Sequence, residues 1–272
     1  MRLKAKSPIE LYPVTSLLVG ANIAVFIAMV LSGVSASNPT LQQILFWGAD
    51  HGPYTLGAQP WRLITSVFLH IGILHLAFNM WALWNLGVLT EMILGHQLYL
   101  ASYLLAGVAG NLLSIAWHPN VVGAGASGAI FGLAGVVISV LKLANLPVPQ
   151  TALRGTLRSV VSFAIYNLLF GTLGSIDNAA HLGGFLCGLA IGALLSWISR
   201  AKLDNRALLH WITIAFVALL LLAGFVSLRS SFERTQKGVD AQAVEWNHQL
   251  SASCITLAPT LQATCNFSPD NS

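Results

Sequence analysis

Long apolar runs separated by short polar stretches account for most of this chain. An α-helix needs about 20 predominantly apolar residues to cross the roughly 30 Å hydrocarbon layer of a bilayer. Runs of about this length with few charges predict seven transmembrane helices, at 14–33, 67–90, 97–117, 124–143, 157–174, 179–199 and 207–228. The pattern therefore predicts an all-α polytopic membrane protein.

The first run also has a second interpretation, a secretory signal. Basic residues precede it and small residues stand at 34–36, where a signal peptidase would cut. Its apolar stretch is longer than the roughly 7–15 residues usual in such signals. We therefore favour an uncleaved first span.

Composition excludes a water-soluble globular protein. Hydrophobic residues make up 56% of the 272 positions and charged residues only 8%, whereas soluble domains have about 45–50% and about 25%. The net charge of +4 is spread between the apolar runs rather than gathered in one cluster, which argues against a nucleic-acid partner. A lipid bilayer is the expected surrounding.

Basic residues predict the orientation, because short cytoplasmic loops retain Lys and Arg. With the N-terminus inside, nine of the thirteen basic residues are cytoplasmic: Arg2, Lys4, Lys6, Lys142, Arg154, Arg158, Arg200, Lys202 and Arg206. Arg229, Arg234 and Lys237 follow the last run and conflict mildly with an extracytoplasmic tail. The conflict disappears if 207–228 does not cross, but its uninterrupted apolar core favours crossing.

Strongly polar side chains lie inside three of the predicted spans. The second span carries His70, His75 and Asn79, the fourth carries Ser127 and the sixth carries His181. All three spans run from outside to inside, so polar groups in their early turns converge on the outer leaflet. Because such groups are costly inside a membrane, each is a candidate functional residue.

Glycines indicate how the fourth and sixth spans meet. They recur every four residues, at Gly128 and Gly132 and at Gly184, Gly188 and Gly192. Small residues at this interval let helix backbones approach closely in lipid, which would bring Ser127 to His181. A serine becomes nucleophilic when a positioned base removes its proton. Either residue alone is more often structural, so the hypothesis rests on their combination.

In combination, the motifs resemble those of the rhomboid family of intramembrane serine proteases, over residues 14–200. The matching motifs are WR at Trp61 and Arg62, HxxxxHxxxN at His70, His75 and Asn79, GxSG at Gly125–Gly128, AHxxG at Ala180–Gly184, and the glutamate Glu91. The resemblance implies a six-helix rhomboid core at 14–200 and an additional C-terminal helix at 207–228. The remaining segments are then a cytoplasmic N-terminus at 1–13 and an extracytoplasmic tail at 229–272.

The resemblance also implies roles for the polar residues. Ser127 is the expected nucleophile and His181 its general base. His75, Asn79 and the Ser127 backbone N–H are expected to form the oxyanion hole, which stabilises the tetrahedral intermediate. The family works with a dyad, so Asp177, four residues before His181, is given no catalytic role.

Further residues are expected to support this site: Gly125, Gly128, Phe131, His70, Trp61, Arg62, Glu91 and Gly184. By resemblance, the phenylalanine packs on the general base. The two glycines of the GxSG motif let the substrate backbone approach, and the histidine helps to line a path for water. The tryptophan and the arginine brace the first outer loop at headgroup level, where both side chain types are favoured.

The substrates implied are single-span membrane proteins. A transmembrane helix holds its carbonyls in internal hydrogen bonds and must unwind before a nucleophile reaches them. By resemblance, the residue before the cut is small. No cofactor or metal is expected, because Cys187, Cys254 and Cys265 fit no metal or redox spacing. The sequence fits either a disulfide between Cys254 and Cys265 in the tail or two free thiols there.

Three rival functions fit the sequence less well than this hypothesis. A non-catalytic rhomboid-like protein that binds client helices shares the fold, but it usually lacks the serine or the histidine. A transporter or channel predicts polar residues through the full membrane depth, and the inner halves of the fourth and sixth spans are nearly all apolar. A soluble-type esterase needs G-x-S-x-G after a strand, and Ala129 replaces the last glycine.

The expected location is a bacterial plasma membrane, with the N-terminus cytoplasmic and the tail extracytoplasmic. No Arg- and Ser-rich transit sequence precedes the first span.

Overall fold

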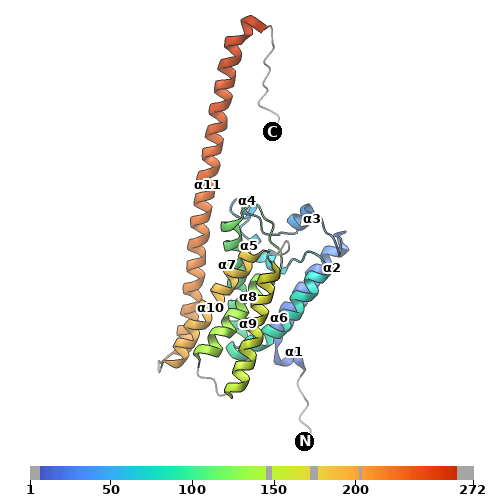
Figure 1. Cartoon of the computed structure of the whole chain (residues 1–272), viewed down its shortest axis with the longest axis vertical. Helices are drawn as coiled ribbons and strands as arrows, with labels where there is room; N and C mark the ends of the chain where they lie inside the picture. Colours follow the sequence, from blue (N-terminus) through green and yellow to red (C-terminus); the bar gives the residue numbers. More distant parts are fainter. Residues whose placement is uncertain (1–6, 145–148, 172–176, 202–203, 262–272) are drawn as a thin grey trace. The chain divides into compact units, whose positions relative to one another are not determined.

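The computed structural model describes residues 7–144, 149–171, 177–201 and 204–261, without the side chains of 8, 168–171 and 247–261. Within these ranges the chain is helical apart from turns, loops and a single isolated bridge between Asp50 and Gly123. The helices are α1 Pro8–Leu11, α2 Pro13–Leu31, α3 Leu41–Phe46, α4 Gly52–Thr55, α5 Arg62–Thr65, the 3-10 turn η1 Ser66–Phe68, α6 Ile73–Leu94, α7 His96–Trp117, α8 Ser127–Leu143, α9 Gln150–Gly171, α10 Asn178–Arg200 and α11 Arg206–Leu261 (Figure 1).

Within the described ranges, five helices are long and apolar enough to cross a membrane, which confirms the polytopic all-α class. They are α2, α6, α7, α10 and the part of α11 from Arg206 to Trp246. Helix α8 is a shorter apolar helix of 17 residues, and all of its residues from Gly128 to Val140 are buried. Helix α9 is 22 residues long but includes Arg154 and Arg158. The number of crossings therefore stays a prediction.

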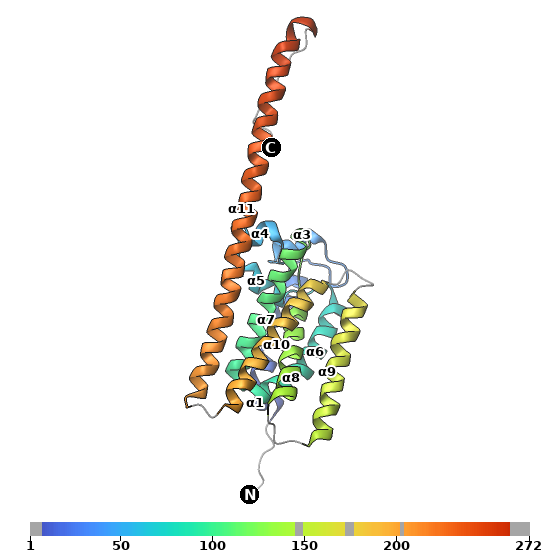
Figure 2. The same ribbon diagram turned by 60° about the vertical axis from the view of Figure 1, so that its left-hand side comes forward.

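Helix α8 lies at the centre of the bundle and packs most extensively against α10, then against α7 and α6 (Figures 1 and 2). Close approach requires the predicted glycines. A Cβ on Gly184 would collide with the Gly128 carbonyl oxygen, and one on Gly188 with the Gly132 carbonyl oxygen. The α8–α10 contact thus forms backbone against backbone, as the spacing of small residues indicates.

The long segment between α2 and α6 folds into short helices held by Arg62. Its guanidinium donates to the Leu45 carbonyl at 2.8 Å, the Ala49 carbonyl at 2.7 Å and the Gln59 side chain at 2.7 Å. It also lies 5.0 Å from the ring centroids of Trp61 and of Tyr54. Arg62 therefore stabilises the fold of this loop.

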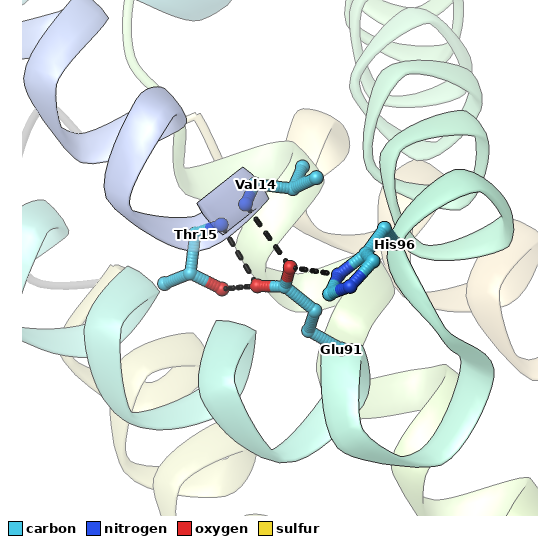
Figure 3. Close-up of polar contacts among 4 residues, drawn as sticks. All are labelled: Val14, Thr15, Glu91 and His96. Carbon is cyan, nitrogen blue, oxygen red and sulfur yellow. Dashed lines mark hydrogen bonds and ion pairs between the residues drawn. The ribbon is translucent and has the colours of Figure 1, made fainter. Parts of the chain in front are cut away.

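Glu91, near the end of α6, holds the beginning of α2 (Figure 3). Its carboxylate accepts hydrogen bonds from the backbone N–H groups of Val14 at 3.0 Å and Thr15 at 2.9 Å, and from the Thr15 hydroxyl at 2.6 Å. His96 Nδ1 lies 2.6 Å from the same carboxylate. Because the first N–H groups of a helix have no internal partner, Glu91 caps α2 from another helix.

Several predicted boundaries differ from the structure, among them the start of α9, which lies at Gln150 rather than at 157. His70 lies in the loop before α6 rather than within a helix, because the chain extends at Leu69 and turns at Gly72, whose φ of +90° favours glycine. Helix α11 continues beyond the predicted end at 228 to Leu261. Its polar part includes good helix formers such as Glu233, Gln236 and Ala241, and an ion pair between Arg229 and Glu233 at 2.9 Å.

The chain divides into two compact units, Met1–Val226 and Ser227–Ser272. The bundle, including the first part of α11, belongs to the first unit. Several predictions fall outside the described residues: the placement of Arg2, Lys4, Lys6, Lys202 and Cys265, and of the Cys254 side chain.

Candidate active site

Ser127 is the first residue of α8, where the chain leaves the loop that follows α7. The preceding residue, Ala126, offers no side chain to cap the helix. The first N–H groups of α8 therefore lack partners within the helix, and the positive end of its dipole lies beside the Ser127 hydroxyl. This position favours negative charge that develops next to the serine.

His181 lies in the first turn of α10 and directly contacts the serine. Its Nε2 is 2.9 Å from Ser127 Oγ, and the residue is only 5% exposed. The Phe131 ring, one turn along α8 from the serine, stacks on the imidazole with centroids 4.2 Å apart and planes 12° apart. The structure thus brings together the three residues predicted to meet here, in a hydrogen-bonded and packed arrangement.

Among the described residues, no acidic group contacts the far nitrogen of His181. Its Nδ1 is buried without a hydrogen-bond partner. The carboxylate of Asp177 instead caps α10, accepting the Ala180 N–H at 2.9 Å, and also accepts the Ser114 hydroxyl. Asp177 therefore stabilises the beginning of α10, and the two-residue dyad stays a prediction.

His75 faces the space beside the serine. Its Nδ1 accepts the Ile71 N–H at 3.3 Å, so the neutral ring carries its proton on Nε2. A Cβ placed on Gly125 would lie 3.0 Å from His75 Nε2 and 3.8 Å from Ser127 Oγ. Because glycine has no Cβ, room is left between a donor and the hydroxyl. Gly125 also has φ of +142°, which other residues rarely adopt.

One of the two amide hydrogens of Asn79 is used in a hydrogen bond within α6. Its Nδ2 donates to the His75 carbonyl one turn back at 2.9 Å. An amide nitrogen carries two hydrogens, so the second remains as a donor for the predicted oxyanion role. His70 is fully buried behind His75, with ring centroids 5.2 Å apart, so it packs against a site residue from the preceding loop.

Two of the remaining supporting residues, Gly128 and Gly184, follow Ser127 and His181 closely on α8 and α10 and form the contact between these helices. The other three have places elsewhere: Trp61 and Arg62 belong to the first loop, and Glu91 caps α2 at the other end of α6. Their predicted support of the site is indirect, through the positions of helices and loops.

Sequence reasoning missed the polar contacts that hold the loops around the dyad. Asp50 exchanges two backbone hydrogen bonds with Gly123, at 2.8 and 2.9 Å, and accepts the Thr55 hydroxyl at 2.6 Å. Burial raises the pKa of the Asp50 carboxyl to about 7. For Asp177 a signal existed, since an aspartate just before an apolar run is a typical N-cap. No sequence signal pointed to Asp50 or Ser114, because their partners Gly123 and Asp177 are distant in sequence.

Comparison with known proteins matches residues 57–198 to the family model described as Rhomboid domain. "Rhomboid protease GluP" of Bacillus subtilis (strain 168) is 35% identical over 214 residues, which cover 78% of this chain and 41% of that protein. "RHOMBOID-like protein 4" of Arabidopsis thaliana is 32% identical over 86% of this chain and 59% of its own length. "Rhomboid-like protease 2" of Toxoplasma gondii is 31% identical over 69% of this chain and 70% of its own length. The chain thus spans about half the length of the first two relatives.

Proposed function

Because the chain belongs to the rhomboid family, we propose that it is an intramembrane serine endopeptidase with Ser127 and His181 as its catalytic dyad. The family includes named proteases, which supports intramembrane proteolysis at the level of the family. The observation that carries the proposal for this chain is the 2.9 Å contact between Ser127 Oγ and His181 Nε2.

The dyad geometry supports acyl transfer. His181 Nε2 takes the hydroxyl proton as Ser127 Oγ attacks the carbonyl carbon of the scissile peptide bond. The imidazolium then gives this proton to the leaving amine, and the C–N bond breaks to leave an acyl-enzyme. Water, deprotonated by the same imidazole, attacks the ester, and the proton returns to Ser127 as the acid product leaves.

Three donors are available for the tetrahedral oxyanion. They are the His75 Nε2–H, the second Nδ2 hydrogen of Asn79 and the backbone N–H of Ser127. The room left by Gly125 lies between His75 and the serine hydroxyl, where the oxygen of an attacked carbonyl would sit. Preorganised donors of this kind contribute about 10²–10³ in rate each.

The substrates proposed are single-span membrane proteins, cut in or near their transmembrane helices in the outer leaflet. Ser127 begins α8 and His181 lies in the first turn of α10, so both are at the same end of the bundle. The distribution of basic residues supports placing this end outside and the N-terminus inside. Substrate helices that carry weak helix formers near that surface would unwind most easily.

The test is cleavage of a tagged single-span substrate by the full chain in liposomes. Wild type is compared with Ser127→Ala and His181→Ala, each shown to be folded by its melting curve. Ser139→Ala is the matched control, since this serine lies on the same helix and bonds the Leu189 carbonyl on α10. We expect cleavage by wild type and by the control, and none by the two dyad variants.

A serine-reactive fluorophosphonate added to the same samples separates a wrong substrate from a wrong proposal. Labelling of wild type but not of Ser127→Ala, without cleavage, identifies an active enzyme that needs another substrate. No labelling of folded wild type would contradict the proposed activity and favour the binding of client helices.

A further inference from the structure

A cavity lies at the end of the bundle opposite the dyad. Its volume is about 330 Å³. It is lined where α6, α8 and α10 end and where α7 and α11 begin, all within the unit Met1–Val226. Helix α8 has 17 residues, so at 1.5 Å per residue the two ends of the bundle are about 25 Å apart. The cavity is therefore separate from the proposed catalytic site.

The lining of this cavity has two chemically different sides. Leu94, Val140 and Leu195 belong to an apolar wall, while Ser199, Arg200 and His210 belong to a polar side. The Ser199 hydroxyl lies 3.3 Å from His210 Nε2, so the polar side joins α10 to α11. No Asp or Glu is among the lining residues. A ligand that fits both sides is itself amphipathic, with an anionic polar part.

Arg200 is available to bind such an anion. Among the described residues the ion pairs are Glu91–His96 and Arg229–Glu233, and neither involves Arg200. Its side chain is at the last position of α10 and exposed. Arg206, one turn before His210 on α11, adds positive charge, against the single carboxylate of Asp204 in the connection. A guanidinium binds phosphate with two parallel hydrogen bonds.

We propose that this cavity binds the phosphate headgroup of an anionic phospholipid. Arg200 holds the phosphate, the Ser199 hydroxyl offers a further donor when His210 Nε2–H donates to its oxygen, and the start of an acyl chain lies along the apolar wall. Basic pockets between transmembrane helices commonly take lipid headgroups on the cytoplasmic side, where the basic residues place this end. The apolar wall favours a lipid over free phosphate, because free phosphate gains nothing from it.

The test measures the melting temperature of the full chain in neutral detergent. Phosphatidylglycerol, phosphatidylcholine and inorganic phosphate are each titrated into wild type, Arg200→Gln and Arg158→Gln. The last variant is the matched control, because Arg158 is an exposed arginine on α9 that does not line the cavity. A ligand that binds only the folded state raises the melting temperature with the logarithm of its concentration once that concentration exceeds its Kd, so the concentration needed for a given rise reports the affinity.

We expect phosphatidylglycerol to raise the melting temperature of wild type and Arg158→Gln equally at each lipid concentration. Arg200→Gln should need about tenfold more lipid for the same rise, the loss typical of one charge-assisted contact. Phosphatidylcholine and inorganic phosphate should have little effect. Equal responses of the two arginine variants, or equal effects of the two lipids, would overturn the proposal. A rise with inorganic phosphate as large as that with phosphatidylglycerol would also overturn it, because it would identify an anion site without lipid preference.

A second variant tests the cavity without changing charge. Ala144 lines the same space just after the end of α8, and Ala144→Leu would occupy part of it. We expect this variant to lose the response to phosphatidylglycerol while it retains its melting temperature without lipid. A full response in Ala144→Leu would show that the lipid acts elsewhere on the surface.

Discussion

At the scale of single residues, the proposed site depends on glycine at position 125, because a side chain there would fill the space beside the serine. The Cα of Gly125 faces the space between His75 Nε2 and Ser127 Oγ, and a Cβ there would lie 2.8 Å from the His75 ring. The backbone N–H of the same residue is fixed by the Ser66 carbonyl at 2.9 Å. The loop therefore keeps the space beside the nucleophile open, with little freedom to adjust.

Gly125→Ala should lower cleavage about 100-fold or more while the chain remains folded. The added methyl would fill the space proposed for the oxyanion, and alanine is strained at a φ of +142°. The measurement is the initial rate of substrate cleavage and of fluorophosphonate labelling. Gly20→Ala is the control, because nothing lies within 4 Å of a Cβ there. Unchanged rates in Gly125→Ala would remove the proposed oxyanion space.

Phe131→Leu should lower turnover roughly tenfold without abolishing folding. Leucine keeps an apolar side chain on α8 but removes the flat ring that stacks on His181 at 4.2 Å, so the imidazole would lose orientation. Measuring kcat and KM separately tests this, since a misoriented base lowers kcat more than it raises KM. A wild-type kcat would mean that the stacked ring has no part in positioning His181.

Asp50 should make stability depend on pH near neutrality. Burial raises the pKa of its carboxyl to about 7, above the value of about 3.9 in an unfolded chain. The folded state therefore binds this proton more tightly, and the contribution to stability is lost as pH rises from about 4 through about 7. The melting temperature of wild type relative to Asp50→Asn should fall by several degrees from about pH 5 to 8. Asp240→Asn, at an exposed position, keeps Asp50 and should follow wild type across this pH range.

At the scale of helices, the α8–α10 contact determines whether the dyad forms. Ser127 and His181 are 54 residues apart, and no loop contact alone would align them to hydrogen-bonding distance. The backbone contacts of Gly184 and Gly188 with α8 fix the register of the two helices. A helix shifted by one residue would move the imidazole by about 1.5 Å along the axis and break the dyad.

Gly188→Ala should lower the melting temperature by roughly 5 °C or more and reduce cleavage in parallel. Its Cβ would collide with the Gly132 backbone, and overpacking of this kind costs about 1–3 kcal/mol. Gly155→Ala, on α9, has no atom within 4 Å of the added Cβ and should be neutral or slightly stabilising. Equal stability of both variants would contradict the close packing of α8 and α10.

Much of the helix arrangement could be predicted from the sequence, because apolar runs and glycine spacing are local signals. The run around His70 was misleading, since its apolar neighbours continue without a break and the positive φ of Gly72 has no signature in hydropathy. The extension of α11 to Leu261 was missed because a polar helix lacks an apolar pattern. The contacts of Asp50 with Gly123 and of Ser114 with Asp177 depend on segments that meet only in the folded chain.

At the scale of the whole molecule, the proposed function depends on which end of the bundle faces outside. The dyad and the cavity beside Arg200 lie at opposite ends, so one determination of orientation assigns a side to both. Basic residues near the Arg200 end support placing it in the cytoplasm.

A topology reporter fused after Ser272 should be extracytoplasmic if α11 crosses the membrane, and one fused after Leu143 in a truncated chain should be cytoplasmic. The two fusions provide controls for each other, because the same reporter must give opposite signals. Cytoplasmic activity after Ser272 would mean that α11 does not cross, which would also resolve the conflict of Arg229, Arg234 and Lys237 with the positive-inside rule.

The cap that Glu91 places on α2 also has a consequence for how the chain is made. Thr15 is synthesised 76 residues before the carboxylate that binds its N–H and hydroxyl. The ribosome therefore completes α2 before this partner exists, and the first N–H groups of the helix gain their cap only once residue 91 has been added. A nascent chain that ends before residue 91 lacks the side chain that anchors the beginning of α2.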